Sequence, residues 1–121
     1  MTPEEYLVQV KDIDLRIRSL EDELLLANRE DDTEYAEQIT DQIEHDISCY
    51  KKIKQKIRNE IQQVKDNRLS TLLMEYYVKG KSWEMVTEAI GMKSVKNVRE
   101  NLHKKALKAF MAAHYEIFLK I

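Results

Sequence analysis

Basic and amide side chains recur near the carboxyl end of the chain, between Lys93 and Lys108. Lysine can bind phosphate or guanine and asparagine can pair with adenine, so such side chains on one helix face suit a DNA major groove. At about 100° per residue, one face holds Lys93, Asn97, Glu100, Asn101, Lys104 and Lys108. The opposite face holds the apolar residues that we expect in the core: Val95, Val98, Leu102, Ala106 and Ala109.

The alternative interpretation of this charged stripe is a solvated helix face, which is the usual state of such a stripe. Glu100 lies in the middle of the stripe and favours that alternative, because a carboxylate repels phosphate. The segment in front of the helix, from Leu72 to Gly91, favours DNA binding over the solvated-face interpretation. It has the order of helix, turn and helix that a DNA-reading unit needs.

Caps and glycines define the elements of that segment. A short helix is expected from about Ser70 to Val78, and Gly80 follows its last turn, where a left-handed cap is common. Ser82 is expected to cap a helix of about eight residues, which Gly91 ends.

The last helix is expected to begin after a cap at Ser94 and to run from Val95 to near Leu119. In front of it, Lys79, Lys81 and the amide end of the helix at Ser82 are candidates for holding backbone phosphates. From Phe110 to Ile121 the chain is apolar nearly all round, so this part is expected to be buried or to form a dimer interface.

The carboxyl-terminal half resembles region 4 of bacterial sigma factors and related phage helix-turn-helix proteins. The shared pattern comprises Gly80, Lys81, Ser82, Trp83, Glu84, Val86, Ala89, Ile90, Gly91, Val98, Leu102, His103, Lys105, Ala106 and Leu107. The whole chain is similar in layout to phage late-transcription activators of the RinA and ArpU kind. The resemblance implies core roles for Trp83, Val86 and Leu102, and a recognition helix from Ser94 to Lys104. It also implies groove and phosphate contacts by Lys93, Ser94, Lys96, Asn97, Arg99, Asn101 and Lys104.

Two long helices are expected before this unit. Thr2, Pro3 and Glu5 form a helix start with a capping box, and the helix should run to about Arg29. Its apolar residues follow a heptad: Tyr6, Val10, Ile13, Ile17, Leu20, Leu24 and Ala27. The second helix, capped by Asp32 or Thr33, has the same period in Ala36, Ile39, Ile43, Ile47, Tyr50, Ile53, Ile57, Ile61 and Val64.

These patterns predict an all-α protein. A long antiparallel coiled-coil hairpin in residues 1–67 precedes a helix-turn-helix unit of the sigma-region-4 kind in residues 68–121, whose carboxyl-terminal helix is apolar. With 2 glycines and 1 proline in 121 residues, and no strand-like alternation, other fold classes are disfavoured. A hairpin buries only one stripe of each helix, so a third partner is expected: the carboxyl-terminal helices or a second chain.

Charge is distributed unevenly along the chain. Residues 1–46 carry 15 acidic and 4 basic side chains, a net charge of −11, whereas residues 68–121 carry 10 basic and 5 acidic ones, a net charge of +5. The basic half is suited to meeting phosphates. The lone Cys49, the acidic Glu4 and Glu5, and the absence of a long apolar run lead us to expect a cytoplasmic protein of a bacterial host, with no membrane contact.

Enzymatic and metal-dependent functions are not expected. His45 and Cys49 lie four residues apart on one helix, which supplies two of the four ligands that a structural zinc site requires. His103 and His114 have no acid or nucleophile at motif spacing, and the chain has no phosphate loop, zinc-finger spacing or nucleophile elbow. No cofactor is expected.

Three functions remain open. The leading one is a phage or prophage transcriptional regulator that binds double-stranded DNA, as a homodimer formed through the coiled coil or the apolar carboxyl-terminal helix. The second is a DNA-packaging recognition subunit resembling a small terminase. The third is a protein-interaction module in which the acidic hairpin contacts RNA polymerase.

Overall fold

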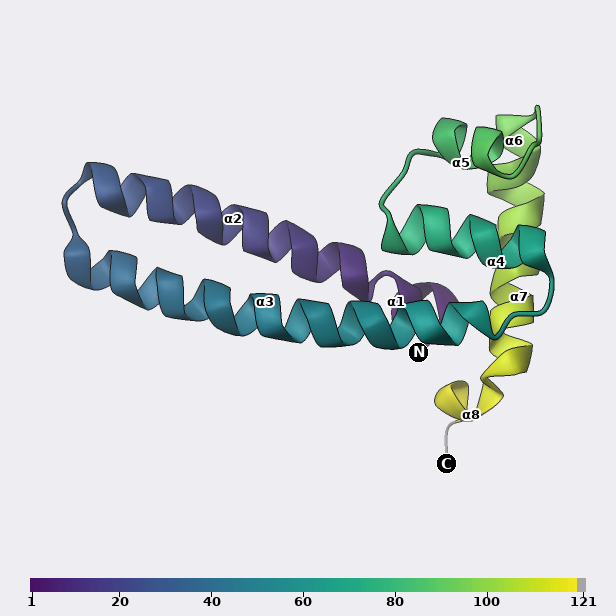
Figure 1. Ribbon diagram of the computed structural model, residues 1–121, viewed down its shortest axis with the longest axis horizontal. Helices are drawn as coiled ribbons and strands as arrows, with labels where there is room; N and C mark the ends of the chain where they lie inside the picture. Colours follow the sequence, from purple (N-terminus) through teal and green to yellow (C-terminus); the bar gives the residue numbers. More distant parts are fainter. Residues whose placement is uncertain (120–121) are drawn as a thin grey trace.

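The structure, a computed structural model, describes residues 1–119 and contains only helices and turns within that range. Two long helices lie side by side and antiparallel, and a cluster of shorter helices packs at one end of them (Figure 1). The all-α class is therefore confirmed. Within the described range, no helix is both long and apolar enough to cross a membrane. Ile121, part of the expected apolar tail, lies outside the described residues.

The first long helix begins at the predicted cap and ends at Arg29 as expected, but it is broken near its start, so the expectation of a single continuous helix is wrong. Helix α1 (Pro3–Leu7) begins at the predicted capping box of Thr2 and Glu5, and α2 (Gln9–Arg29) follows after Val8. Because of this break, Tyr6 and Leu7 are buried in the core at the end of the two long helices where the shorter helices pack. Burial of these two side chains accounts for the bend, which no local sequence signal marks.

Helix α3 (Thr33–Gln62) returns along α2 after a tight turn in which Asp31 has a positive φ of 54°. The Asp32 side chain accepts a hydrogen bond from the Tyr35 amide, which makes it the cap. We call α2, α3 and this turn the hairpin. Its seam is buried or half-buried at every predicted apolar position: Val10, Ile13, Ile17, Leu20, Leu24, Ala27, Ala36, Ile39, Ile43, Ile47, Tyr50, Ile53, Ile57 and Ile61.

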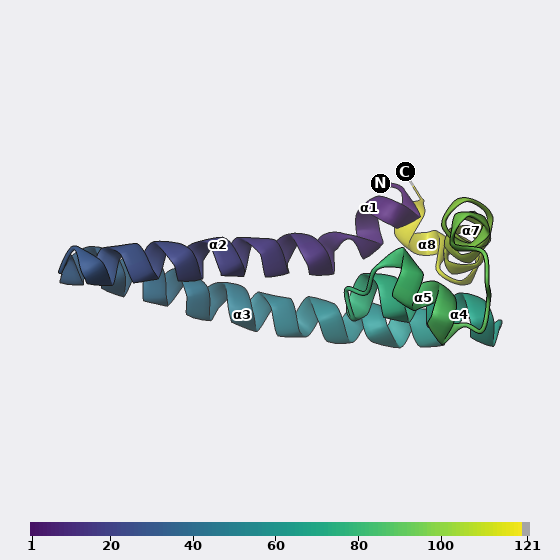
Figure 2. The same ribbon diagram turned by 90° about the horizontal axis from the view of Figure 1, so that it is seen from above.

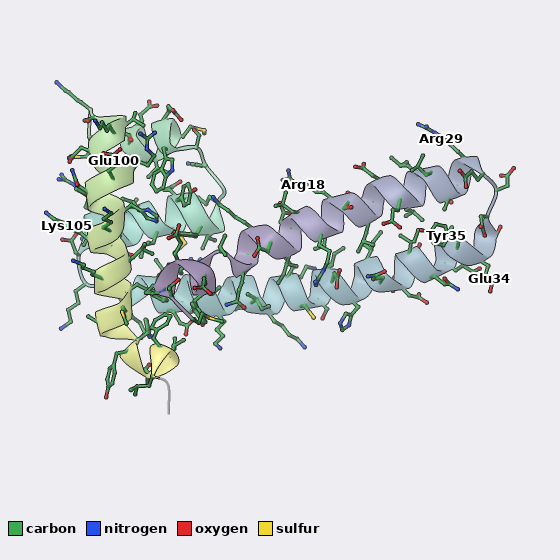
Figure 3. All side chains as sticks on the ribbon, turned by 180° about the vertical axis from the view of Figure 1, so that it is seen from behind. Arg18, Arg29, Glu34, Tyr35, Glu100 and Lys105 are labelled. Carbon is green, nitrogen blue, oxygen red and sulfur yellow. The ribbon has the colours of Figure 1, made fainter. Side chains whose placement is uncertain are left out.

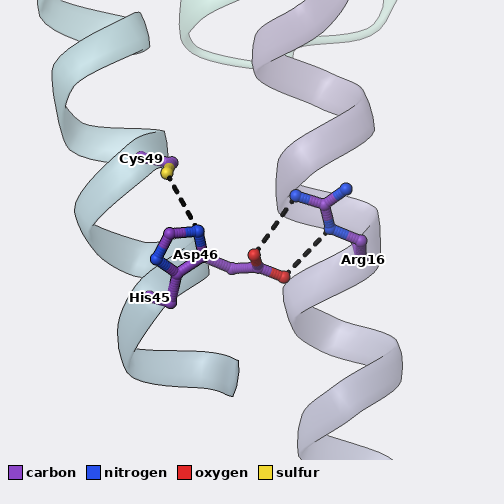
Figure 4. A network of polar contacts seen from close by, with 4 residues as sticks. All are labelled: Arg16, His45, Asp46 and Cys49. Carbon is purple, nitrogen blue, oxygen red and sulfur yellow. Dashed lines mark hydrogen bonds and ion pairs between the residues drawn. The ribbon is translucent and has the colours of Figure 1, made fainter. Parts of the chain in front are cut away.

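A bidentate ion pair crosses the middle of the hairpin. Arg16 donates from Nε and Nη2 to the two carboxylate oxygens of Asp46, at 2.9 and 3.2 Å (Figure 4). Asp46 is buried although it is charged. The pair fixes the register of the two helices at one point.

Helix α4 (Asn67–Leu73) begins earlier than predicted, because the Asp66 side chain caps it by accepting from the Arg68 and Leu69 amides. It continues without interruption into a π-helical turn, η1 (Met74–Val78). Gly80, with φ +69°, then reverses the chain as predicted. Helix α5 (Trp83–Ala89) follows, with Ser82 as its cap.

The last long helix consists of α6 (Val95–Asn97), a π-helical turn η2 (Val98–Leu102) and α7 (His103–Ala113). Gly91, with φ +72°, ends α5, and Ser94 caps α6, both as predicted. The expectation that this helix continues to Leu119 is wrong. His114 leaves the helical conformation, its Nε2 donates to the Glu60 carbonyl oxygen at 2.7 Å, and the chain turns into the short α8 (Tyr115–Phe118).

One hydrophobic core joins the base of the hairpin to the carboxyl-terminal helices, and Figure 2 shows α1 close to α8 and α7. Its buried residues before position 67 are Tyr6, Leu7, Val10, Ile57, Ile61 and Val64. Those after it are Leu72, Leu73, Tyr77, Val78, Val86, Ile90, Val98, Ala106 and Phe110. The expected domain boundary at residue 67 therefore passes through a shared core.

Candidate nucleic-acid interface

The outer face of the helix from Val95 to Ala113 is basic. Its exposed cations are Lys96, Arg99, Lys104, Lys105 and Lys108, and one exposed acid, Glu100, lies among them. Lys105 projects away from the hairpin (Figure 3). The opposite side of the same helix is buried at Val98, Ala106 and Phe110. Val98 and Ala106 were predicted on the core face, whereas Asn97, predicted on the charged face, is half-buried.

Polar contacts on the outer face are few and weak. The Asn101 amide donates to the Asn97 side-chain oxygen at 2.7 Å, and Asn97 is half-buried. Arg99 and Glu100 approach to 3.9 Å with both side chains about half exposed. An ion pair of this kind contributes little free energy, so Arg99 can exchange its partner at small cost.

The π-helical turn η2 changes which residues share the outer face. It adds one residue to a helical turn, so side chains after Leu102 are rotated relative to an unbroken α-helix. As a result His103 turns inward and the adjacent pair Lys104 and Lys105 turns outward. Lys105 was absent from the contacts implied by the resemblance, and only the π turn would have indicated it.

Lys93 and Ser94 lie at the start of this helix. Lys93 is exposed, and the Ser94 hydroxyl accepts a hydrogen bond from the Asn97 amide at 3.2 Å. Ser94 therefore acts as the cap of α6. Because the residue is exposed, it is also accessible to a ligand.

Lys79 and Lys81, two predicted phosphate ligands, are both paired with one carboxylate of the same chain. Their amino groups lie 2.9 and 2.7 Å from the carboxylate oxygens of Glu75, which is buried. Hydrogen bonds from Lys81 and Lys79 hold the pKa of Glu75 below its ordinary value. Ser82, the third residue of this group, accepts from the Met85 amide as the cap of α5. These contacts give all three residues a structural role.

Aromatic side chains hold α5 and α7 at their mutual angle. Trp83 stacks on Tyr76 with ring centroids 3.9 Å apart, and His103 packs edge-on against Trp83 at 4.8 Å. The Tyr77 hydroxyl lies 2.6 Å from His103 Nε2. Burial lowers the pKa of His103, so the neutral ring can accept a hydrogen bond from the tyrosine hydroxyl. Trp83 thus has the packing role predicted for it.

A groove of about 560 Å³ runs beside this helix. It lies between the start of α4 and the last long helix, and its lining includes two cations, Arg68 and Lys105, and one acid, Asp66. Arg68 was not among the predicted contacts, because its sequence position near a helix start gave no signal of nearness to α7. It extends the basic surface beyond the last long helix.

No metal centre is formed by the described residues: no group of three or more His, Cys, Asp or Glu side chains could hold an ion. His45 Nε2 lies 3.8 Å from Cys49 Sγ on the outside of α3 (Figure 4).

Comparison with known proteins gives no relative for this chain: no protein-family model, curated protein or solved structure matches it.

Proposed function

We propose that this chain binds double-stranded DNA through the outer face of the helix from Val95 to Ala113. The supporting observation is the concentration of five exposed cations and one acid on a helix whose other face is buried. Lysine and arginine in this arrangement can neutralise phosphates, and the length of the helix suits a major groove. Arg68, across the groove from Lys105, supplies a further phosphate contact.

Base reading is assigned to Arg99 and Asn101 within the same proposal. Arginine can pair with guanine and asparagine with adenine through two hydrogen bonds each. Both side chains are exposed, and they lie on opposite flanks of the helix because they are two residues apart. With a coiled-coil hairpin and a helix-turn-helix of the sigma-region-4 kind as the proposed architecture, the role that fits is regulation of phage or prophage transcription.

The test compares two double variants of equal charge change. Lys104→Glu with Lys105→Glu alters the proposed interface, and Lys51→Glu with Lys52→Glu alters an exposed lysine pair on α3. Fluorescence polarisation with duplex DNA over a salt series gives the affinity and the salt dependence. We expect the first variant to weaken binding and to lower the slope of log K against log salt by about 0.9 for each phosphate that the protein no longer neutralises.

The α3 variant is expected to lose less affinity. Equal losses in both variants would mean that overall charge, and no particular surface, governs binding. Absence of binding by the unmodified protein at low salt would refute the proposal.

A further inference from the structure

The outward side of α2 is an apolar face without a partner in the described chain. Leu15, Leu25 and Leu26 are 62%, 60% and 53% exposed, and they point away from the seam with α3. Three leucines this exposed on one face of a helix make that face suited to contact with another apolar surface. In the half of the hairpin far from the carboxyl-terminal helices, no third helix of the described chain covers this face. The hydrophobic cluster in that half contains only residues of α2 and α3.

The charges on this face differ from those of the hairpin as a whole. Arg18 and Arg29 project on the side of α2 away from α3 (Figure 3), and Asp22 lies between them in sequence. Most of the acids of residues 1–46 lie elsewhere. Two such faces can therefore approach each other, although two whole hairpins repel.

We propose that a second copy of this chain covers this face, with its α2 antiparallel to the first. A register centred near residues 20 and 21 places Leu15 of one copy against Leu26 of the other. The same register places Arg18 of one copy against Asp22 of the other. An antiparallel pair has twofold symmetry, so each of these contacts occurs twice. The four helices of two hairpins then lie in one layer, with the two copies of α2 in the middle and the two copies of α3 outside.

The ends of the two hairpins are complementary in the same register. At the base of each hairpin a crevice of about 590 Å³ is lined by four cations and one acid: Lys11, Arg18, Lys54, Lys79 and Asp14. Arg18 is already paired with Asp14 at 3.1 Å, and Lys79 with Glu75 at 2.9 Å. Among the described residues, no carboxylate lies within ion-pair distance of Lys11 or Lys54. The register brings residues 30–32 of the second copy, which are Glu30, Asp31 and Asp32, alongside residues 9–11 and this crevice. Acidic residues of one copy then lie beside basic residues of the other at both ends of the α2 pair.

The exposed apolar residues at the other end of the molecule fit a second copy less well. Met111, Tyr115 and Leu119 are exposed around α7 and α8, with Lys108 one turn away. Pairing of two such surfaces would bring lysines together, with Glu116 as the nearby acid. We therefore assign the interface to α2, and this assignment does not depend on the proposed DNA binding.

The test uses two charge variants, each of which should fail to dimerise alone and should dimerise when mixed with the other. Arg18→Asp makes the face acidic and Asp22→Arg makes it basic, so each copy repels itself in the proposed register and attracts the other variant. Light scattering after size exclusion is expected to show a dimer for the unmodified protein, half that mass for each variant alone, and a dimer for the equimolar mixture. Both side chains are exposed, and far-UV circular dichroism verifies that helix content is kept.

Two further double variants distinguish the α2 interface from the alternative interface around α7 and α8. Leu15→Ser with Leu26→Ser is expected to halve the mass, whereas Met111→Ser with Tyr115→Ser is expected to leave the dimer intact. The proposal is overturned if the unmodified protein is a monomer, if the charge variants remain dimers alone, if their mixture fails to associate, or if only the Met111 and Tyr115 variant dissociates.

Discussion

The buried Asp46 carboxylate depends on a single partner, Arg16, for its side-chain hydrogen bonds. Its carboxylate is buried between α2 and α3, and both of its oxygens accept from Arg16. Arginine meets a carboxylate with two parallel N–H groups, whereas lysine offers a point charge. The pair is therefore sensitive to changes that leave the charge unaltered.

Arg16→Ala is expected to destabilise the protein by about 1–3 kcal/mol, because the Asp46 carboxylate remains buried without its donors. Arg16→Lys should recover only part of that stability. Arg58→Ala, an exposed position on α3, is the control and should change the free energy of unfolding by less than about 0.5 kcal/mol. Urea unfolding followed by circular dichroism measures all three, and equal effects at positions 16 and 58 would contradict the structural role of the pair.

Glu75 should make the stability depend on pH in the acid range. Hydrogen bonds from Lys81 and Lys79 lower its pKa in the folded state below the ordinary value of 4.5. A group with a lowered folded pKa stabilises the protein above its unfolded pKa, and that contribution disappears as pH falls through the folded pKa. The free energy of unfolding should therefore decline below about pH 4.5, more in the unmodified protein than in Glu75→Gln. Urea titrations between neutral and acid pH test this, and parallel curves for the two proteins would exclude Glu75 as the cause.

At the scale of helices, local signals predicted where elements begin and where glycine ends them. Ser82 and Ser94 are caps, and Gly80 and Gly91 have positive φ, because these features depend on neighbouring residues alone. The heptad seam of the hairpin was predictable for a related reason, since its period repeats over many turns.

Two of the features that sequence reasoning missed depend on distant contacts. The bend at Val8 follows from burial of residues next to Phe110, and the break at His114 is accompanied by a hydrogen bond to Glu60. The π turn at Val98–Leu102 has no composition signal, yet it decides that Lys105 faces outward. The candidate surface was thus predictable as a basic helix with Lys96, Arg99 and Lys104, whereas Lys105 and Arg68 were missed.

Ser94 allows the role of a cap to be separated from the role of a DNA contact. Ser94→Asp keeps an oxygen that accepts from the Asn97 amide and adds negative charge at a helix start, so stability should be unchanged or slightly higher. The added charge should weaken DNA binding, because it repels phosphate. Ser94→Ala is the matched control and should cost about 1 kcal/mol of stability through removal of the cap. Thermal unfolding and polarisation measure the two effects, and undiminished DNA affinity in Ser94→Asp would place the start of α6 outside the interface.

At the scale of the whole molecule, the shared core makes the hairpin and the carboxyl-terminal helices depend on each other. Phe110 has no exposed surface, lies with its ring 5.9 Å from that of Tyr6, and belongs to the same cluster as Ile57 and Ile61. A basic surface carried on α7 is therefore held in place by residues at both ends of the chain.

Phe110→Ala is accordingly expected to destabilise the entire protein, by about 3–5 kcal/mol. Trp83 is the only tryptophan and reports on the carboxyl-terminal helices, whereas circular dichroism is dominated by the longer helices of the hairpin. In a cooperative two-state transition different probes coincide. The two probes should thus give one urea midpoint in the unmodified protein, and the substitution should lower both midpoints equally. If fluorescence changed first while most of the helix signal persisted, the hairpin would be an independent folding unit, stabilised by its distal cluster of Leu20, Ala27, Ile39 and Ile43 and by the ion pair of Arg16 with Asp46.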